Sequence, residues 1–139
     1  MSRKLEEFLQ TYDIEANLDE EVIFSARFLD EAGKPIPATV RPMSLKEYNG
    51  YQKNATKVGR HGKVDFDSET YFSTIIINHT VSPDFKNKET LEKAGCLTSL
   101  QYLNKVFNAG EIAELAKEIQ RVSGFDDETI EDLKAKVKN

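Results

Sequence analysis

Apolar and polar residues alternate over two stretches near the N-terminus. Seven apolar residues follow this spacing in two runs: Val22, Phe24, Ala26 and Phe28, then Ile36, Ala38 and Val40. A spacing of two places these side chains on one face of a strand. Between the runs, Gly33 can take a positive φ and Pro35 favours an extended exit from a turn. The pattern predicts an antiparallel β-hairpin over about residues 21–41, with one buried and one solvent-facing side.

The second strand of this hairpin is bounded by Pro37 and Pro42. Because proline has no backbone N–H to donate to a sheet, we expect this strand to lie at an edge or to pair on one side. A lone hairpin is marginally stable in water, so other elements must pack on it.

Apolar residues spaced three and four apart predict helices for most of the remaining chain. The expected helices carry these residues: Leu5, Phe8, Leu9 and Tyr12 after Ser2 as a cap; Leu45, Tyr48 and Ala55, ending at Gly59; Tyr71, Phe72, Ile75, Ile76 and His79 after Asp67 or Ser68; residues 88–94, ending at Gly95; Leu100, Leu103, Val106 and Phe107; Ile112, Leu115, Ala116, Ile119 and Val122; and Ile130, Leu133 and Val137 after Asp126 or Asp127.

Several residues are expected to set the ends of these helices. Ser44 with Glu47, and Thr98 with Gln101, have the spacing of a capping box. Gly110 is expected to break the helix that Thr98 opens, and Gly124 to end the next one.

Two stretches are less regular. Residues 74–81 are rich in β-branched side chains and fit a strand, but the longer apolar spacing favours a helix. Residues 60–66 are polar and rich in glycine, which predicts a mobile loop.

Composition adds limits to this picture. A chain of 139 residues fits one domain, here residues 1–139, and we expect a mainly helical α+β fold. The net charge of −5 argues against a nucleic-acid-binding protein. Cys96 is the one cysteine, so an internal disulfide is excluded and a reducing compartment is expected. Near the N-terminus, Glu6 and Glu7 stand where a signal peptide would need a run of apolar residues. The apolar run at residues 75–77 is too short to span a bilayer.

No motif in the sequence indicates catalysis. The segment from Gly59 to Lys63 lacks the spacing of a phosphate-binding P-loop. His61, His79 and Cys96 lack metal-ligand spacing, and His79 fits a hydrogen-bonded histidine on an apolar helix face. An enzyme would need a pocket that folding makes from these three residues and Asp65. We therefore expect a non-enzyme without a cofactor or a metal.

Three stretches together resemble a known family. They are Arg27-Phe28 with Asp30, Gly33 to Pro37 and Arg41-Pro42; Pro83 to Lys86; and Ala109-Gly110-Glu111 with Leu115, Gly124 to Asp126 and the final Lys138-Asn139. In this order and spacing they are similar to the XkdN-like tail assembly chaperones of contractile-tailed phages and phage-like elements. The resemblance spans nearly the whole chain.

The resemblance implies a non-catalytic chaperone of the bacterial host cytoplasm. Such a protein would bind the tape-measure protein, or another tail protein, and keep it soluble while the phage or prophage tail is assembled. An alternative is a structural tail or head–tail connector protein that stays in the virion. A homo-oligomer is also possible. Nucleic acid and membranes are not expected as partners.

Amphipathic helices near the C-terminus are our candidate surface for such a partner. The candidate partner-binding residues are Phe107, Ile112, Leu115, Ile130, Leu133 and Val137. The alternative for each of them is a place in the protein's own core.

Overall fold

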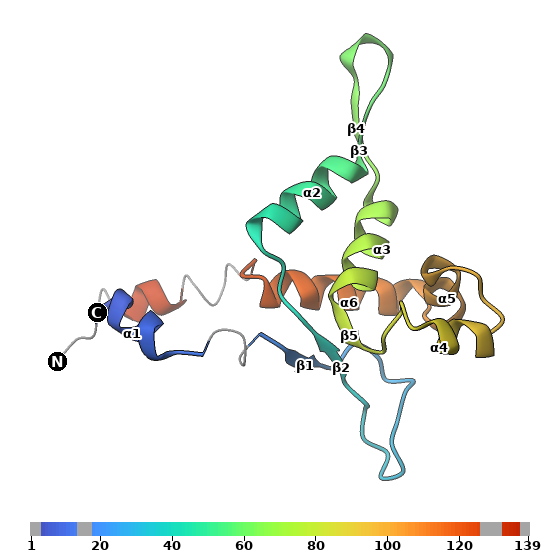
Figure 1. The fold of residues 1–139 in the computed structure, drawn as a ribbon, viewed down its shortest axis with the longest axis horizontal. Helices are drawn as coiled ribbons and strands as arrows, with labels where there is room; N and C mark the ends of the chain where they lie inside the picture. The colour runs from blue at the N-terminus through green and yellow to red at the C-terminus, as the bar shows by residue number, and fades with distance from the viewer. Residues whose placement is uncertain (1–3, 14–17, 126–131, 137–139) are drawn as a thin grey trace.

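A computed structural model of the chain describes residues 4–13, 18–125 and 132–136 (Figure 1). The helices are α1 (Leu5–Thr11), α2 (Leu45–Ala55), α3 (Ser68–His79), α4 (Lys88–Lys93), α5 (Ser99–Val106) and α6 (Ala109–Val122). The strands are β1 (Glu20–Val22), β2 (Ala38–Val40), β3 (Thr56–Val58), β4 (Val64–Phe66) and β5 (Thr80–Ser82). The predicted α+β class, mainly helical with an N-terminal hairpin, is confirmed.

Strands β1, β2 and β5 form an antiparallel sheet with β2 in the centre. Val22 of β1 lies opposite Ala38 of β2, and β5 pairs with the other side of β2. The expectation that this strand lies at an edge or pairs on one side is therefore wrong. Pro37 and Pro42 lie outside the three-residue strand, so neither removes a hydrogen-bond donor from it.

The predicted hairpin over residues 21–41 is present, but its regular pairing is short. At its far end the Ile36 N–H donates to the Phe28 carbonyl over 2.7 Å. Gly33 turns the chain with a φ of 82°, as its place in the sequence predicted. The alternation fails at Ala26, which is exposed, because the chain bends out of the strand at this point.

A second hairpin follows α2. Strands β3 and β4 pair antiparallel and are joined by a 3₁₀ turn over Arg60–Gly62. The prediction that the preceding helix reaches Gly59 is wrong, because α2 ends at Ala55. Of the loop predicted over residues 60–66, the last three residues form strand β4 instead. His61 adopts a left-handed φ of 66°, which folds the chain back and lets the strands pair.

Helix α3 confirms the helical prediction for the β-branched stretch. It begins after Asp67, whose carboxylate accepts the Thr70 N–H at 3.2 Å. It ends at His79, and the chain then continues into β5 from Thr80. The alternative interpretation of residues 74–81 as a strand is therefore correct for residues 80 and 81, which belong to β5.

The capping box of Ser44 and Glu47 opens α2 as predicted. The box predicted for α5 is half formed. Thr98 accepts the Gln101 N–H at 3.1 Å, but the Gln101 side chain accepts from the Leu97 N–H instead of from Thr98.

Helix α6 begins earlier than expected. Asn108 and Glu111 form a reciprocal capping box, which places Gly110 in the first turn. The prediction that Gly110 breaks a helix is therefore wrong, because the break lies at Phe107 and Asn108, which both have an extended backbone. Gly124 ends α6 with a φ of 99°, as predicted.

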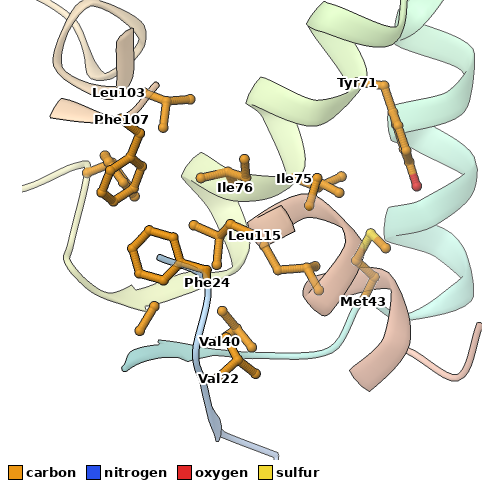
Figure 2. Packing of buried hydrophobic residues seen from close by; sticks show 14 of the residues in the cluster. Val22, Phe24, Val40, Met43, Tyr71, Ile75, Ile76, Leu103, Phe107 and Leu115 are labelled. Atoms are coloured by element: carbon orange, nitrogen blue, oxygen red, sulfur yellow. The ribbon is translucent and has the colours of Figure 1, made fainter. Parts of the chain in front are cut away.

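The core lies where α3 crosses α6, with α2, α5 and the sheet around it (Figures 1 and 2). Its fully buried large side chains are Phe85, Ile75, Ile76, Leu103, Leu115, Ile119 and Val40. Met43 donates its N–H to the Ser123 hydroxyl at the end of α6, which ties the sheet-to-α2 connection to this helix. Phe125 then packs on Tyr48 with 4.9 Å between ring centroids.

Helix α1 stands apart from this core at one end of the molecule (Figure 1). None of its residues is buried, and Lys4 precedes it without a side-chain cap. Ser2, the predicted cap, lies outside the described residues, as do Ile130 and Val137 of the predicted last helix. Residues 132–136 of that helix are helical.

Candidate partner-binding surface

The six predicted contact residues occupy different environments. Phe107 and Leu115 are buried in the core, and Ile112 packs against it half-buried. Leu133 is exposed on helical residues 132–136, and the other two residues lie outside the described part of the chain. In this conformation the Leu115 side chain, on α6, is completely buried in the core and offers no exposed area to a partner.

Phe107 and Ile112 are brought together in a groove of about 570 Å³. This groove, called the α3 groove here, lies between the start of α3 and the junction of α5 with α6. Its lining residues are Ser68, Glu69, Phe72, Ser73, Asn104, Phe107, Asn108, Ala109, Ile112 and Ala113. A groove lined by both apolar and polar side chains is typical of a surface that binds an amphipathic segment.

Phe107 also lines a second groove, of about 370 Å³, called the aromatic groove here. Its lining residues are Phe24, Phe28, Ile36, Pro37, Ser82, Pro83, Tyr102, Val106 and Phe107. The hairpin and the cis Ser82-Pro83 bond form one wall, and α5 forms the other. The predictions from sequence missed this groove, because its walls come from three distant parts of the chain.

The Phe107 ring is held between the two grooves by other aromatic rings. Its centroid lies 4.9 Å from that of Phe24, 5.6 Å from Phe28 and 5.7 Å from Phe85. Figure 2 shows Phe107 between Leu103 and Phe24, and the Phe24 and Phe107 rings meet edge to face. Contacts of this kind add to the energy of apolar burial and fix the ring orientation.

An ion pair fastens the hairpin wall to α6. Arg27 donates from Nε to Glu111 Oε2 over 2.9 Å and from a terminal nitrogen to Oε1 over 2.6 Å. The same guanidinium donates to the Val106 carbonyl and lies over the Phe28 ring, 4.7 Å from its centroid. The Ser25 hydroxyl also donates to Glu111. This network fixes the wall that Phe28 contributes to the aromatic groove.

The Glu111 carboxylate is strongly stabilised in its charged form. The hydrogen bonds from Arg27, from Ser25 and from the Asn108 N–H lower its pKa to about 2, although its burial acts in the opposite direction. Arg27 and Glu111 belong to two of the stretches that carry the family resemblance. Their pairing was missed because 84 residues separate them.

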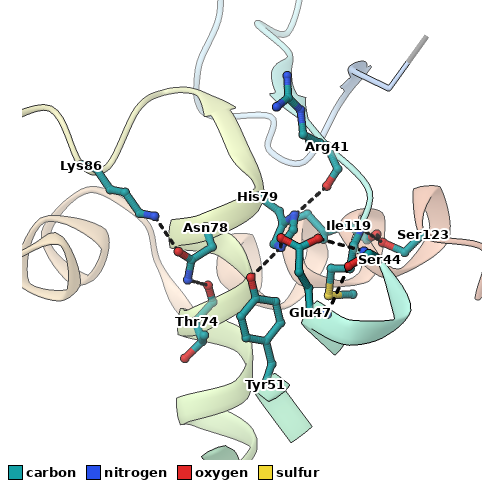
Figure 3. A network of polar contacts seen from close by, with 11 residues as sticks. Arg41, Ser44, Glu47, Tyr51, Thr74, Asn78, His79, Lys86, Ile119 and Ser123 are labelled. Carbon is teal, nitrogen blue, oxygen red and sulfur yellow. Dashed lines mark hydrogen bonds and ion pairs between the residues drawn. The ribbon is translucent and has the colours of Figure 1, made fainter. Parts of the chain in front are cut away.

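His79 lies in a separate polar network between α2, α3 and β2 (Figure 3). Its Nδ1 faces the Arg41 carbonyl at 3.2 Å and its Nε2 faces the Tyr51 hydroxyl at 2.9 Å. A carbonyl oxygen can only accept, so Nδ1 carries the proton and Nε2 accepts from Tyr51. Burial lowers the pKa of His79, although Glu47 at 3.8 Å acts against this shift. The prediction of a hydrogen-bonded histidine on an apolar helix face is confirmed.

The residues named for an alternative enzyme site lie on separate elements. His79 is in the core, His61 is at the exposed turn between β3 and β4, and Cys96 follows α4. Within the described ranges, no three His, Cys, Asp or Glu side chains are grouped to hold a metal ion. The same ranges contain no helix with the length and apolar character to cross a bilayer.

Comparisons with known proteins agree with the resemblance seen in the sequence. The model of a family described as "Phage XkdN-like tail assembly chaperone protein" matches residues 5–138. "Phage-like element PBSX protein XkdN" of Bacillus subtilis (strain 168) is 30% identical over 123 residues, which cover 85% of this chain and 82% of that protein. "Uncharacterized protein YqbN" of the same strain is 30% identical over 137 residues, which cover 95% of this chain and 91% of that protein.

A solved structure has the same fold. The crystal structure of the protein yqbn superposes with a TM-score of 0.63 at 25% identity, covering 91% of this chain and 100% of that chain. From the family match and these relatives, the chain belongs to the XkdN-like family of phage tail assembly chaperones.

Proposed function

We propose that this chaperone binds the tape-measure protein in the host cytoplasm and keeps it soluble during tail assembly, without catalysis. The observation that carries the proposal is the pair of grooves that meet at Phe107, of which the aromatic groove is mainly apolar and the α3 groove has a mixed lining. Family membership supports the general role in tail assembly. The grooves support a particular way to perform it, in which an apolar helix of the client lies along the surface.

The groove walls suit such a helix. Phe28 and Ile112 are half-buried and Ile36 is exposed, so each offers apolar area that a client can cover. Covering apolar surface contributes about 25 cal/mol per Å² to association before the entropic costs of binding. The fixed aromatic walls need little reordering on binding.

The other predicted contact residues take different parts in this proposal. Leu115 is buried in the core and lines neither groove, whereas the exposed Leu133 offers apolar area on helical residues 132–136. Ile130 and Val137, which lie outside the described residues, stay predictions of partner contact.

Co-expression with the tape-measure protein tests the proposal. The chaperone should raise the soluble yield of the client and elute with it on gel filtration. Ile36→Glu places a charge in the aromatic groove without changing a buried residue, and it should abolish both effects. Leu45→Glu is the matched control, because Leu45 is exposed on α2 and lines neither groove. It should leave both effects intact.

Several results would contradict the proposal. They are an unchanged client yield, no complex on gel filtration, or equal losses in the two variants. Mass spectrometry of purified tails tests the alternative of a structural tail or connector protein. A chaperone should be absent from finished particles, whereas a structural component would be present in a fixed ratio.

A further inference from the structure

The two grooves that meet at Phe107 differ in charge. All described residues that line the aromatic groove are uncharged, whereas the α3 groove has one charged residue in its described lining, Glu69. This acid is exposed in the first turn of α3. No lysine, arginine or histidine belongs to the described lining of the same groove. The α3 groove therefore combines apolar side chains with a single negative charge.

The Glu69 carboxylate has no ion-pair partner among the described residues. It is also not the cap of α3. Asp67 has that role, because its carboxylate accepts the Thr70 N–H at 3.2 Å and the Thr70 hydroxyl at 2.7 Å. Covering an unpaired charge is costly unless the covering molecule supplies the opposite charge. A partner that fills this groove should therefore carry a cation.

The wall formed by α5 adds a hydrogen-bond acceptor. Asn104 donates from its amide nitrogen to the Leu100 carbonyl over 3.1 Å. Its amide oxygen takes part in no hydrogen bond with the residues that the structure describes, and Asn104 lines the α3 groove. Lysine and arginine side chains have several N–H donors and no acceptor. The groove therefore offers acceptors on two of its walls to a cationic side chain.

Apolar area lies one helical turn from this acid. Phe72 follows Glu69 by three residues on α3, so the two side chains lie on the same face of the helix. Both line the α3 groove. Phe72 and Ile112 are half-buried, and each offers apolar area to a partner. A partner helix that matches both features has a lysine or arginine one turn from an apolar residue.

We propose that the α3 groove binds an amphipathic client helix that carries a basic residue beside its apolar residues, and that Glu69 selects for this residue. The inference rests on the proposed function, since it names the kind of client segment that the groove accepts. Between segments of equal hydrophobicity, the charge decides. An acid at the same place in the client would face Glu69 and be disfavoured by repulsion.

Three synthetic peptides test this preference. Each has about 20 residues, above the length at which isolated helices are marginal. All three carry the same leucines on one helix face, with lysine, glutamine or glutamate one turn from them. Fluorescence anisotropy at about 0.1 M salt measures the dissociation constants. The wild-type chain should bind the lysine peptide about tenfold more tightly than the glutamate peptide, with the glutamine peptide between them.

Charge reversal at Glu69 separates a local pair from the general attraction of an acidic chain for cations. Glu69→Lys should invert the preference, so that the glutamate peptide binds more tightly than the lysine peptide. Glu92→Lys is the matched control, because it changes the net charge of −5 by the same amount. Glu92 is exposed on α4 and lines neither groove. The control should keep the preference within about twofold of that of wild type.

Two further variants locate the peptide. Ala113 is exposed on α6 and lines the α3 groove, so Ala113→Trp should fill the groove and weaken all three peptides about tenfold or more. Ile36→Gln changes the aromatic groove without adding a charge and should leave the preference for lysine unchanged. None of the tested substitutions changes a buried residue, and circular dichroism should show an unchanged fold.

Three results would overturn the inference. They are equal affinities of the three peptides for the wild-type chain, equal changes in Glu69→Lys and Glu92→Lys, or a preference that is lost in Ile36→Gln and kept in Ala113→Trp. The last result would place the helix in the aromatic groove. None of them contradicts the proposed function, which the co-expression experiment measures. Conversely, an unchanged yield of the tape-measure protein together with a preference that depends on Glu69 would contradict the proposed client and support the groove specificity.

Discussion

The Glu111 carboxylate takes part in two features of the candidate site, a helix cap and an ion pair. Its side chain caps the first turn of α6 through the Asn108 N–H and accepts hydrogen bonds from Arg27 and Ser25. Helix capping is a local property, whereas the ion pair joins segments 84 residues apart. One carboxylate therefore connects a helix start to the wall of the aromatic groove.

Replacing this carboxylate tests its role in stability. Glu111→Gln removes the charge and an acceptor oxygen from a buried network, so it should lower the free energy of unfolding by about 1–3 kcal/mol. Urea denaturation measures this change. Glu89→Gln is the control, because the Glu89–Lys93 pair is fully on the surface and should contribute little. Equal effects in the two variants would contradict the burial and pairing of Glu111.

The same residue predicts a loss of stability in acid. The pKa of Glu111 is about 2 in the folded chain, below its ordinary value of 4.5, so the unfolded chain takes up the proton first. The stabilisation is complete above pH 4.5 and declines as the pH falls toward 2. Glu111→Gln should flatten the stability profile in this range. A profile as steep as that of wild type would show that other carboxylates cause the acid sensitivity.

His79 predicts a second pH dependence, at higher pH. Burial lowers its pKa below the ordinary value of 6.5, so lowering the pH protonates the unfolded chain first and favours unfolding. Its contribution is present above about pH 6.5 and decreases below it. Urea denaturation at several pH values should show this decrease in wild type and in His61→Gln. It should be absent in His79→Gln; persistence there would exclude His79 as the cause.

At the scale of single elements, helix ends depend on backbone conformation more than on packing. Gly124 has a φ of 99° and follows α6, where the Phe125 N–H returns to the Gln120 carbonyl. This is a Schellman motif, which favours glycine because a Cβ strains the left-handed conformation. Gly50, in contrast, lies inside α2, and an added Cβ there would meet no atom within 4 Å.

Two glycine replacements should therefore have opposite signs. Gly124→Ala should lower the free energy of unfolding by about 1 kcal/mol through backbone strain. Gly50→Ala should raise it by about 0.5–1 kcal/mol, since alanine loses less entropy in a helix. Urea midpoints with unchanged slopes measure both effects. A gain in stability at Gly124 would contradict the end of α6 described here.

At the scale of the whole molecule, the α3–α6 contact joins the sheet, α2 and α5 around one cluster of buried side chains. Leu115 is completely buried in this cluster. We propose that the chain is a single domain, because the sheet, α2, α3, α5 and α6 share these buried side chains. A single core of this kind should unfold as one cooperative unit.

Leu115→Ala tests this coupling. It should lower the free energy of unfolding by about 2–5 kcal/mol, through lost burial and the cavity left behind. Circular dichroism and tyrosine fluorescence should report the same lowered midpoint, since the tyrosines lie on several elements. Leu45→Ala, at an exposed position, should change the midpoint little. Two separate transitions would argue for more than one cooperative unit.

The elements that sequence predicted well are those whose signals are local. Ser44 with Glu47 and Asp67 define helix starts through hydrogen bonds within four residues. The apolar spacing of α6 also identified its buried face. Gly124 marked the end of α6, because glycine readily adopts the positive φ required there. The family was also identified from local signals, since its motifs, such as Arg27-Phe28, are short runs of neighbouring residues in a fixed order.

Other features depend on residues far apart in the chain. The central place of β2 depends on β5, which begins 40 residues after the end of β2 in sequence numbering. Arg27 and Glu111 pair across 84 residues, and the aromatic groove forms where the hairpin, the Ser82-Pro83 bond and α5 meet. Amphipathic spacing could not separate Leu115, in the core, from Ile112, at a groove.

The sequence by itself determined the fold class, the helix faces, several helix starts and the family of this protein. These follow from side-chain spacing and short-range hydrogen bonds, which neighbouring residues complete among themselves. Only the tertiary structure decided which apolar residues are covered, which charges pair and where grooves lie. Burial and pairing arise from contacts between distant segments, and one-dimensional spacing does not contain that information.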